Sequence, residues 1–345
     1  MPVFSFTAPL ITPEEEALER ENLSKEQKAE VQEDLYGGSG CGWTKALYDV
    51  EQNDGFLTTK LQELEQALSE MTPNLLKDYN KAMETAPDVV QTESDPVKFL
   101  RCERYDVIAA AKRIQLYWKM RRKIFGDDRA FLPMTLHAAM KDDAHVIESL
   151  AIYSILPEDA HGRKVLFFDR IKIVAPQVDR DIALRCMFYM IQVISEDVHA
   201  QKHGFVCLNN MKGYDLYKNF DRLFFKQASV LMVECMPTKT KAYHLLAGSE
   251  NGVMSLVLPV KKHIAAKELR LRMVVHFGTD YKIVDSLKPF GLSSKNVSHV
   301  VGGDFTEAEW TKWLSDRKET ESLSEMNCSP RLSSVVHSFG SALSS

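Results

Sequence analysis

Apolar and polar positions alternate in two different ways along the carboxyl-terminal two thirds of the chain. Five short apolar runs have the length and composition of buried strands: 151–156, 164–168, 205–209, 242–247 and 271–277. Three helix-length stretches lie among them: 179–202, 215–233 and 280–288. Strands that alternate with helices are typical of βαβ units, so we predict an α/β fold with a mostly parallel sheet flanked by helices.

The preceding part of the chain follows a helical pattern instead. Apolar residues recur every three or four positions in two stretches: Leu57, Leu61, Leu64 and Leu68, and then Val107, Ala111, Ile114 and Trp118. This spacing places each set on one face of a helix. We therefore predict a small all-α module over residues 57–126 and place the α/β domain at 133–318.

Both ends of the chain differ from these two regions. Residues 1–56 predict an acidic, partly disordered segment, in which Thr12 caps a helix that fades by Tyr36. The Gly-rich run at 37–42 lacks the spacing of a phosphate-binding loop and is interpreted as a linker. Residues 319–345 are rich in Ser and lack periodicity, which predicts a disordered tail.

Residues 253–263 form an unusual helix-length stretch. Val253 to Val260 is almost entirely apolar, and Lys261, Lys262 and His263 follow it. One interpretation is a fully buried helix. The other is a mobile lid that covers an apolar cavity and presents apolar and basic side chains, including both lysines, to a membrane.

Composition restricts the class of protein. The six cysteines show no C-x-x-C spacing, the amino terminus lacks the basic and apolar regions of a secretory signal, and no run of 18 apolar residues occurs, so an intracellular, cytoplasmic protein is expected. Charge is distributed unevenly. Residues 1–95 carry 7 Lys and Arg against 20 Asp and Glu, whereas residues 96–345 carry 36 against 28. The basic body is consistent with contact to an anionic surface, and the acidic segment with either a solvated helix or a protein-binding region.

Several short motifs occur in an order that resembles the CRAL-TRIO lipid-binding family. The resemblance covers about residues 57–318. It rests on six segments: Phe99–Val107, Tyr117–Arg121, His161–Val165, Gly204–Gly213, Met236-Pro237 and Val300–Gly303. It implies an α/β domain with an apolar pocket under a movable gate helix, preceded by a helical module. Thr238 departs from the acidic residue of the phosphatidylinositol-binding members, and Asn209 stands where the family usually has Asp.

The resemblance implies a non-enzymatic protein that binds one lipophilic ligand and transfers or presents it at membranes. The pocket residues that we expect are Tyr153, Phe188, Val206, Leu208, Met232, Met254, Val257, Leu258 and Val274. The residues expected at a headgroup or membrane phosphate are Thr238, Lys261, Lys262, Lys267, Arg270 and Arg272. The alternative is an interaction module that has lost the pocket and binds a small GTPase or another protein.

Other functions have little support in the sequence. His199 and His203 have the spacing of a metal pair, but no third ligand accompanies them in a recognisable motif. No G-x-S-x-G elbow occurs, and no Cys stands five residues before an Arg as in thiol phosphatases. We therefore expect no cofactor, no metal and no catalysis. The basic cluster at 119–123 is too small to predict a nucleic-acid partner.

Overall fold

The computed structural model describes residues 11–38, 49–248, 258–259 and 261–328. Its centre is a five-stranded sheet in the order β1-β2-β3-β4-β5. The strands are β1 (Tyr153–Leu156), β2 (Lys164–Asp169), β3 (Phe205–Asn210), β4 (Thr240–Ala247) and β5 (Met273–Phe277). Strand β1 pairs antiparallel with β2, and all other pairs are parallel. The predicted α/β fold with a mostly parallel sheet is confirmed.

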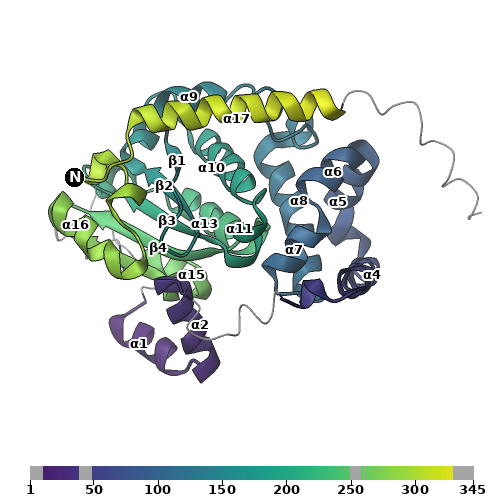
Figure 1. The fold of residues 1–345 in the computed structure, drawn as a ribbon, viewed down its shortest axis with the longest axis horizontal. Coiled ribbons are helices and arrows are strands. Elements are labelled where there is room, and N and C mark those ends of the chain that lie inside the picture. Colours follow the sequence, from purple (N-terminus) through teal and green to yellow (C-terminus); the bar gives the residue numbers. More distant parts are fainter. Residues whose placement is uncertain (1–10, 39–48, 249–257, 260, 329–345) are drawn as a thin grey trace, which may run out of the picture. The chain divides into compact units, whose positions relative to one another are not determined.

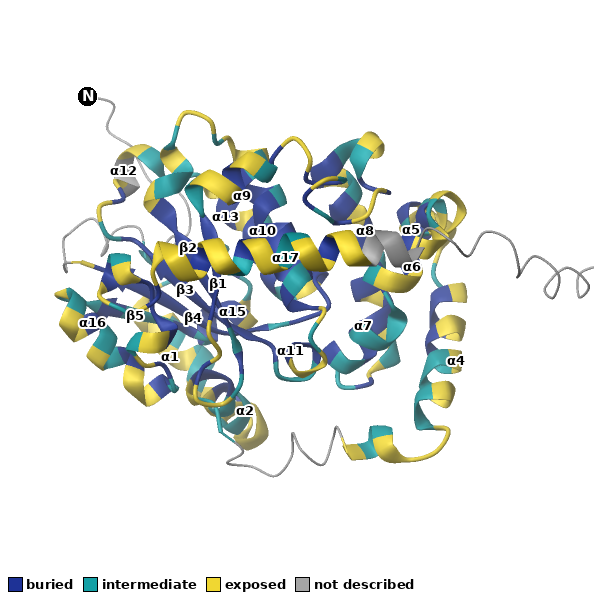
Figure 2. Cartoon of the chain, turned by 45° about the horizontal axis from the view of Figure 1, so that its top comes forward, coloured by how far each residue is buried: buried dark blue, intermediate teal, exposed yellow. Residues whose placement is uncertain are grey.

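Helices cover both faces of the sheet (Figure 1). Because side chains alternate along a strand, residues in register such as Leu166, Cys207 and Tyr243 share one face. The helices and turns around the sheet are α9 (Ala144–Leu150), η2 (Arg170–Val174), α10 (Arg180–Ile194), α11 (Val198–His203), α12 (Leu216–Asn219), α13 (Arg222–Val230), the π-helical turn η3 (Leu231–Cys235), α15 (Lys267–Leu271), α16 (Asp280–Leu287), η4 (Lys288–Phe290), η5 (Ser294–Asn296) and η6 (His299–Val301). Strands β1 to β4 are buried almost throughout, whereas β5 is partly exposed (Figure 2).

Two predicted long helices are interrupted. The stretch 179–202 divides into α10 and α11 because the Asp197 carboxylate accepts a hydrogen bond from the backbone N–H of His199 and starts a new helix. The stretch 215–233 divides in the same way at Asp221, which accepts from the N–H of Phe224 and caps α13. Short polar caps inside an amphipathic pattern are hard to recognise from periodicity alone.

The helical module consists of α4 (Phe56–Ser69), α5 (Pro73–Thr85), α6 (Pro87–Glu93), α7 (Pro96–Cys102) and α8 (Val107–Arg129). Helix α8 changes direction at Gly126, whose φ of 73° is outside the helical range. Helix α7 packs on α11, and α8 on α10, so the module lies beside the sheet domain.

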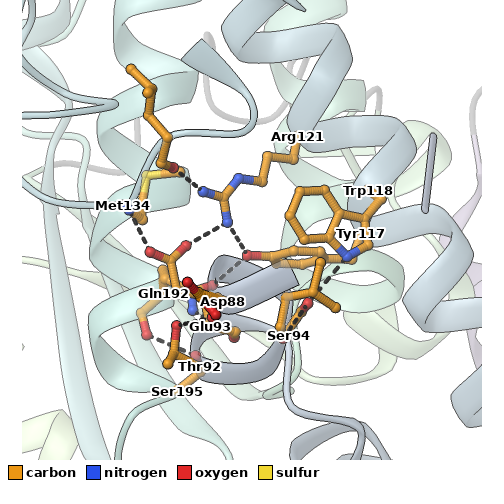
Figure 3. A network of polar contacts seen from close by, with 12 residues as sticks. Asp88, Thr92, Glu93, Ser94, Tyr117, Trp118, Arg121, Met134, Gln192 and Ser195 are labelled. Atoms are coloured by element: carbon orange, nitrogen blue, oxygen red, sulfur yellow. Dashed lines mark hydrogen bonds and ion pairs between the residues drawn. The ribbon is translucent and has the colours of Figure 1, made fainter. Parts of the chain in front are cut away.

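A buried polar network joins the module to α10 (Figure 3). The Arg121 guanidinium is fully buried and donates to the Glu93 carboxylate at 2.5 Å and to the Tyr117 hydroxyl at 2.9 Å. The Tyr117 hydroxyl donates to Oε1 of Gln192 in α10 at 3.0 Å. The indole N–H of Trp118 donates to Ser94 Oγ at 3.1 Å. Tyr117 and Trp118, which carry part of the family resemblance, are therefore structural residues of this joint.

The described part of the acidic amino-terminal segment is mostly helical. It contains α1 (Pro13–Glu21), α2 (Lys25–Tyr36) and the short η1 (Val50–Gln52). Ser24 forms a capping box that separates α1 from α2, which were predicted as one helix. Val31 and Leu35 of α2 are buried, and α2 contacts β4 and η4. The residues 12–36 are thus part of the body.

Helix α17 (Glu307–Cys328) belongs to a second compact unit, residues 306–345. It extends ten residues beyond the predicted boundary at Lys318. An ion pair at 2.7 Å between Arg317 and Glu321, which is one turn away, supports the extension. The rest of the predicted tail lies outside the described residues.

Candidate functional site

A small apolar cavity lies on one face of the sheet, beneath α13. Its volume is about 10 Å³, roughly the space of a single water molecule. Aromatic and sulfur-containing side chains dominate its wall. The lining residues are Tyr153, Leu166, Phe168, Arg170, Met187, Cys207, Phe224, Phe225, Ala228, Met232 and Tyr243. The wall therefore combines strands β1 to β4 with α10, α13 and the π-helical turn η3.

Three buried polar atoms without a hydrogen-bond partner lie on this face of the sheet. They are the hydroxyl oxygen of Tyr153, Nε of Arg170 and Oδ1 of Asn209. Asn209 shares the cavity face because it is in register with Phe168, and its amide nitrogen donates to the Tyr243 hydroxyl. Burial raises the pKa of Tyr153 well above its usual value, so its hydroxyl stays protonated. Unpaired buried polar atoms are rare, and three on one face of the sheet mark a polar position in an apolar wall.

Two basic side chains are buried at one end of the cavity. Arg170 is 1% exposed, and its guanidinium carbon lies 5.1–5.4 Å from the ring centroids of Phe168, Tyr214 and Phe224. Lys261 is 0% exposed; its Nζ lies 5.3 Å from the Phe225 ring centroid and 3.7 Å from Met211 Sδ. Burial, and after it the charge of Arg170, lowers the pKa of Lys261 well below its usual value. Among the described residues neither side chain forms an ion pair with a carboxylate.

The two larger clefts are polar and lie near the amino ends of the parallel strands. One, of about 700 Å³, is lined by charged and histidine side chains that include Glu51, His161 and Lys202. The other, of about 540 Å³, includes Arg113, Lys239 and Met232. Met232 lines both this second cleft and the apolar cavity. A lipophile fits the chemistry of the small cavity better than that of either cleft.

Residues 162–293 match the model of the family described as the divergent CRAL/TRIO domain. This part of the chain is similar to a divergent CRAL/TRIO domain. The match includes β2 to β5 and both buried basic residues, and the family is one of lipid-binding domains. The crystal structure of Sfh5 is similar with a TM-score of 0.45 and 12% sequence identity, over 76% of this chain and 98% of that one. No curated protein sequence matches the chain.

Some of the expected pocket residues line the cavity, and others lie away from it. Tyr153 and Met232 line it. Val206 and Leu208 are in register with Ala242 and His244, and all four lie on the opposite face of the sheet. Side chains of a strand alternate between faces, so an expectation that is off by one residue places the wrong set at the cavity. Cys207 faces the cavity in their place.

The remaining expected pocket residues lie elsewhere. Phe188 contacts Tyr117 and Phe125 of the helical module, and its neighbour Met187 faces the cavity instead. Val274 is in register with His244, on the face away from the cavity. Leu258 is half-buried in a described helical fragment. Met254 and Val257, with most of the expected gate helix, lie outside the described residues.

The expected phosphate-binding residues are mostly engaged within the protein. Thr238 is fully buried and donates to the carbonyl of Ala200 at 2.7 Å. Lys261 is buried at the cavity, although we expected it on the outer surface of the gate helix together with Lys262. Successive helical residues differ by about 100° in direction, so two neighbours rarely share one face.

The outer basic residues contact the acidic amino-terminal helices. Lys262 pairs with Glu16 of α1, and Arg270 pairs with Glu19 at 2.6 Å. Arg272 pairs with Asp34 of α2 at 2.6 Å, while Lys267 is exposed. The unequal charge of the two parts of the sequence is thus used, at least in part, inside the molecule.

The two histidines with metal-pair spacing lie side by side in α11. His199 and His203 stack with their ring centroids 4.3 Å apart, and burial lowers the pKa of His203 to about 4. Within the described ranges, no group of three or more His, Cys, Asp or Glu side chains has the arrangement of a metal site. In the same ranges no helix has the length and hydropathy needed to span a bilayer.

Sequence reasoning missed Arg170, which is the residue that distinguishes this cavity. It directly follows the apolar strand Val165–Phe168 and Asp169. A basic residue at the carboxyl end of a buried strand is a usable signal, because ligands of open α/β sheets bind at that edge.

Proposed function

We propose that the chain binds a single lipophilic molecule in the CRAL/TRIO domain and presents or transfers it at membranes. The observation that carries the proposal is the apolar cavity under α13, whose wall is built from aromatic and methionine side chains. Burial of a lipid chain stabilises a complex by about 0.8 kcal/mol per CH₂ group.

Ligand binding requires the cavity to expand. Pockets for molecules of this size typically have roughly 300–1,000 Å³, far more than the 10 Å³ described here. Met232 supports one route, since it lies in the π-helical turn and separates the cavity from the 540 Å³ cleft. A π-helical turn marks a local irregularity that often occurs at functional sites. Rotation of the unbranched Met232 side chain would join the two spaces.

Mass spectrometry of an organic extract of the purified full-length chain tests the proposal directly. We expect one lipophile at close to one molecule per chain. Delipidated protein should regain thermal stability with that molecule, because a ligand that binds only the folded state raises the melting temperature. An extract without a stoichiometric lipophile, together with no thermal shift for phospholipids, sterols, fatty acids or isoprenoids, would overturn it.

A second candidate function is a protein-binding module of the same fold. The observation in its favour is that bulky side chains, among them Phe168, Phe224 and Phe225, fill the described cavity almost completely. In that case the small cavity is a packing defect and no ligand copurifies. The extraction experiment separates the two functions.

A further inference from the structure

The buried basic residues at the cavity lack a counter-charge. An arginine cannot lose its proton in a protein, and a buried charge costs several kcal/mol unless an opposite charge compensates it. Aromatic rings surround the Arg170 guanidinium, and its Nε has no partner. Lys261 adds a second amine whose contacts are a thioether and an aromatic ring. Among the described residues, no carboxylate therefore compensates the positive charge at this end of the cavity.

The position of the pair within the sheet indicates a binding edge. Arg170 directly follows the carboxyl end of β2, and Met211, which Lys261 contacts, directly follows the carboxyl end of β3. Neighbouring parallel strands thus bring both residues to one edge, where ligands of open α/β sheets bind. The outer basic residues Lys262, Arg270 and Arg272 have acidic partners, whereas among the described residues the two inner ones form no ion pair.

We propose that Arg170 and Lys261 form an internal oxyanion site, which takes the carboxylate or phosphate of an amphiphile. The amphiphile's apolar part lies against the Phe224, Phe225 and Met232 side of the cavity. Charge-assisted hydrogen bonds from a guanidinium and an ammonium are the strong contacts for such a head. The Tyr153 hydroxyl, also without a partner, is a neutral donor on the same wall. The inference rests on the proposed function and narrows it from any lipophile to an anionic one.

Matched ligands test the site in the full-length, delipidated chain. Oleic acid and oleyl alcohol share one chain and differ in the charge of the head, and lysophosphatidic acid provides a phosphate. We expect the wild-type protein to bind oleate at least tenfold more tightly than oleyl alcohol by calorimetry, which corresponds to about 1.4 kcal/mol. In Arg170→Met and in Lys261→Met this ratio should fall below about threefold, while alcohol binding remains.

A neighbouring lysine provides the control. Lys172→Met removes a positive charge two positions from Arg170 but affects a lysine that already pairs with Asp169, so it should retain the preference for oleate. Lys261→Met should also raise the melting temperature of the ligand-free protein, because it replaces an uncompensated buried amine with an apolar side chain of similar volume. A merely structural lysine would instead show a lower melting temperature and an unchanged ligand preference, which would overturn the proposal.

The remaining outcomes separate the inference from the proposed function. Equal affinity of the wild type for acid and alcohol would overturn the oxyanion site and leave lipophile binding intact. If neither amphiphile binds, and the extraction and thermal-shift experiments also find no lipophile, the proposed function fails. In that case the melting temperature is measured with inorganic phosphate. If phosphate raises it in the wild type but not in Arg170→Met, the site binds a free anion. If phosphate does not raise it, the oxyanion site is overturned as well.

Discussion

The turn at Gly302 and Gly303 requires residues without a side chain. A Cβ atom built on Gly303 would lie 2.0 Å from the backbone carbonyl oxygen of Val297, and one on Gly302 would lie 2.6 Å from Cβ of Asp280. Gly302 also has a φ of +90°, a conformation that other residues rarely adopt. The backbone of this turn therefore approaches its neighbours more closely than any side chain allows.

We expect Gly303→Ala to destabilise the protein by about 1–3 kcal/mol, because the backbone atoms that it meets cannot rotate away. Chemical denaturation measures the loss. Gly248→Ala is the matched control: like Gly303, Gly248 has no positive φ, but its Cβ position meets only the flexible Lys212 side chain, at 3.4 Å. Its cost should be small, within about 0.5 kcal/mol, as at surface positions without strain or close packing. An equal loss at both positions would show that the close approach to Val297 is not the cause.

Glu51 joins the helical module to the sheet domain through one carboxylate. It accepts from Arg101 Nε at 2.7 Å and from the Tyr105 hydroxyl at 2.6 Å, and pairs with Lys202 of α11 at 2.7 Å. Burial tends to raise the pKa of Glu51, but these partners outweigh it and lower the pKa to about 2. The lowered pKa means that folding favours the ionised carboxylate.

The contribution of Glu51 to stability should therefore depend on pH. It is fully present above the ordinary pKa near 4.5 and is lost as the pH falls through about 2. We expect Glu51→Gln to cost up to about 3 kcal/mol at pH 7 and progressively less between pH 4.5 and 2. Urea unfolding at a series of pH values measures this difference, with the exposed Glu14→Gln as the control for loss of one carboxylate. A cost that stays constant down to pH 2 would contradict the ion-pair explanation.

At the scale of elements, α1 and α2 cover the basic edge formed by α15 and the residues around it. Besides the ion pairs of Glu16 and Glu19, Arg20 donates to the carbonyl of Leu271 at 3.1 Å. Under the proposed function this edge also faces an anionic membrane. The two roles compete, since a cation paired with Glu16 or Glu19 is less available to a phosphate.

We predict that Glu16→Gln with Glu19→Gln strengthens binding to anionic vesicles by about tenfold or more at low salt, and by less at high salt. The reason is that each basic residue released near an anionic leaflet contributes about 1 kcal/mol. Vesicle sedimentation with phosphatidylserine measures the effect. The exposed pair Glu14→Gln with Glu21→Gln, on the same helix, changes net charge equally and serves as the control. Equal gains for both pairs would show that net charge alone, rather than release of Lys262 and Arg270, is responsible.

At the scale of the whole molecule, the spacing of apolar residues was sufficient to predict the α/β fold class. The strands of the α/β fold and the helical pattern over 57–126 follow from apolar spacing, because burial on one face is a property of each segment alone. The breaks at Asp197 and Asp221 do not, since a capping carboxylate looks like any other polar residue of an amphipathic helix. The sequence also could not predict which side chains of a strand face the cavity when both faces of the sheet are buried. Val206 and Cys207 are both apolar, and the packing of the helices determines that Cys207 faces the cavity.

The site was predictable only in part for a related reason. Tyr153 and Met232 lie in apolar runs near the cavity, but Arg170 and Lys261 looked like surface cations until the tertiary structure buried them. A sequence records the charge of a side chain, whereas its partners depend on residues far away in the chain.

The packing of α1 on α15 also orders the events of folding during synthesis. Arg20 and Leu271, which form one hydrogen bond, are 251 residues apart. At about 5–20 residues per second a ribosome needs roughly 10–50 s to make the chain between them. Helices of 9 and 12 residues are marginal by themselves in water. These two helices leave the ribosome long before their partners and are therefore among the last to become stable, so the nascent chain carries an unpaired acidic segment while the rest of its body folds.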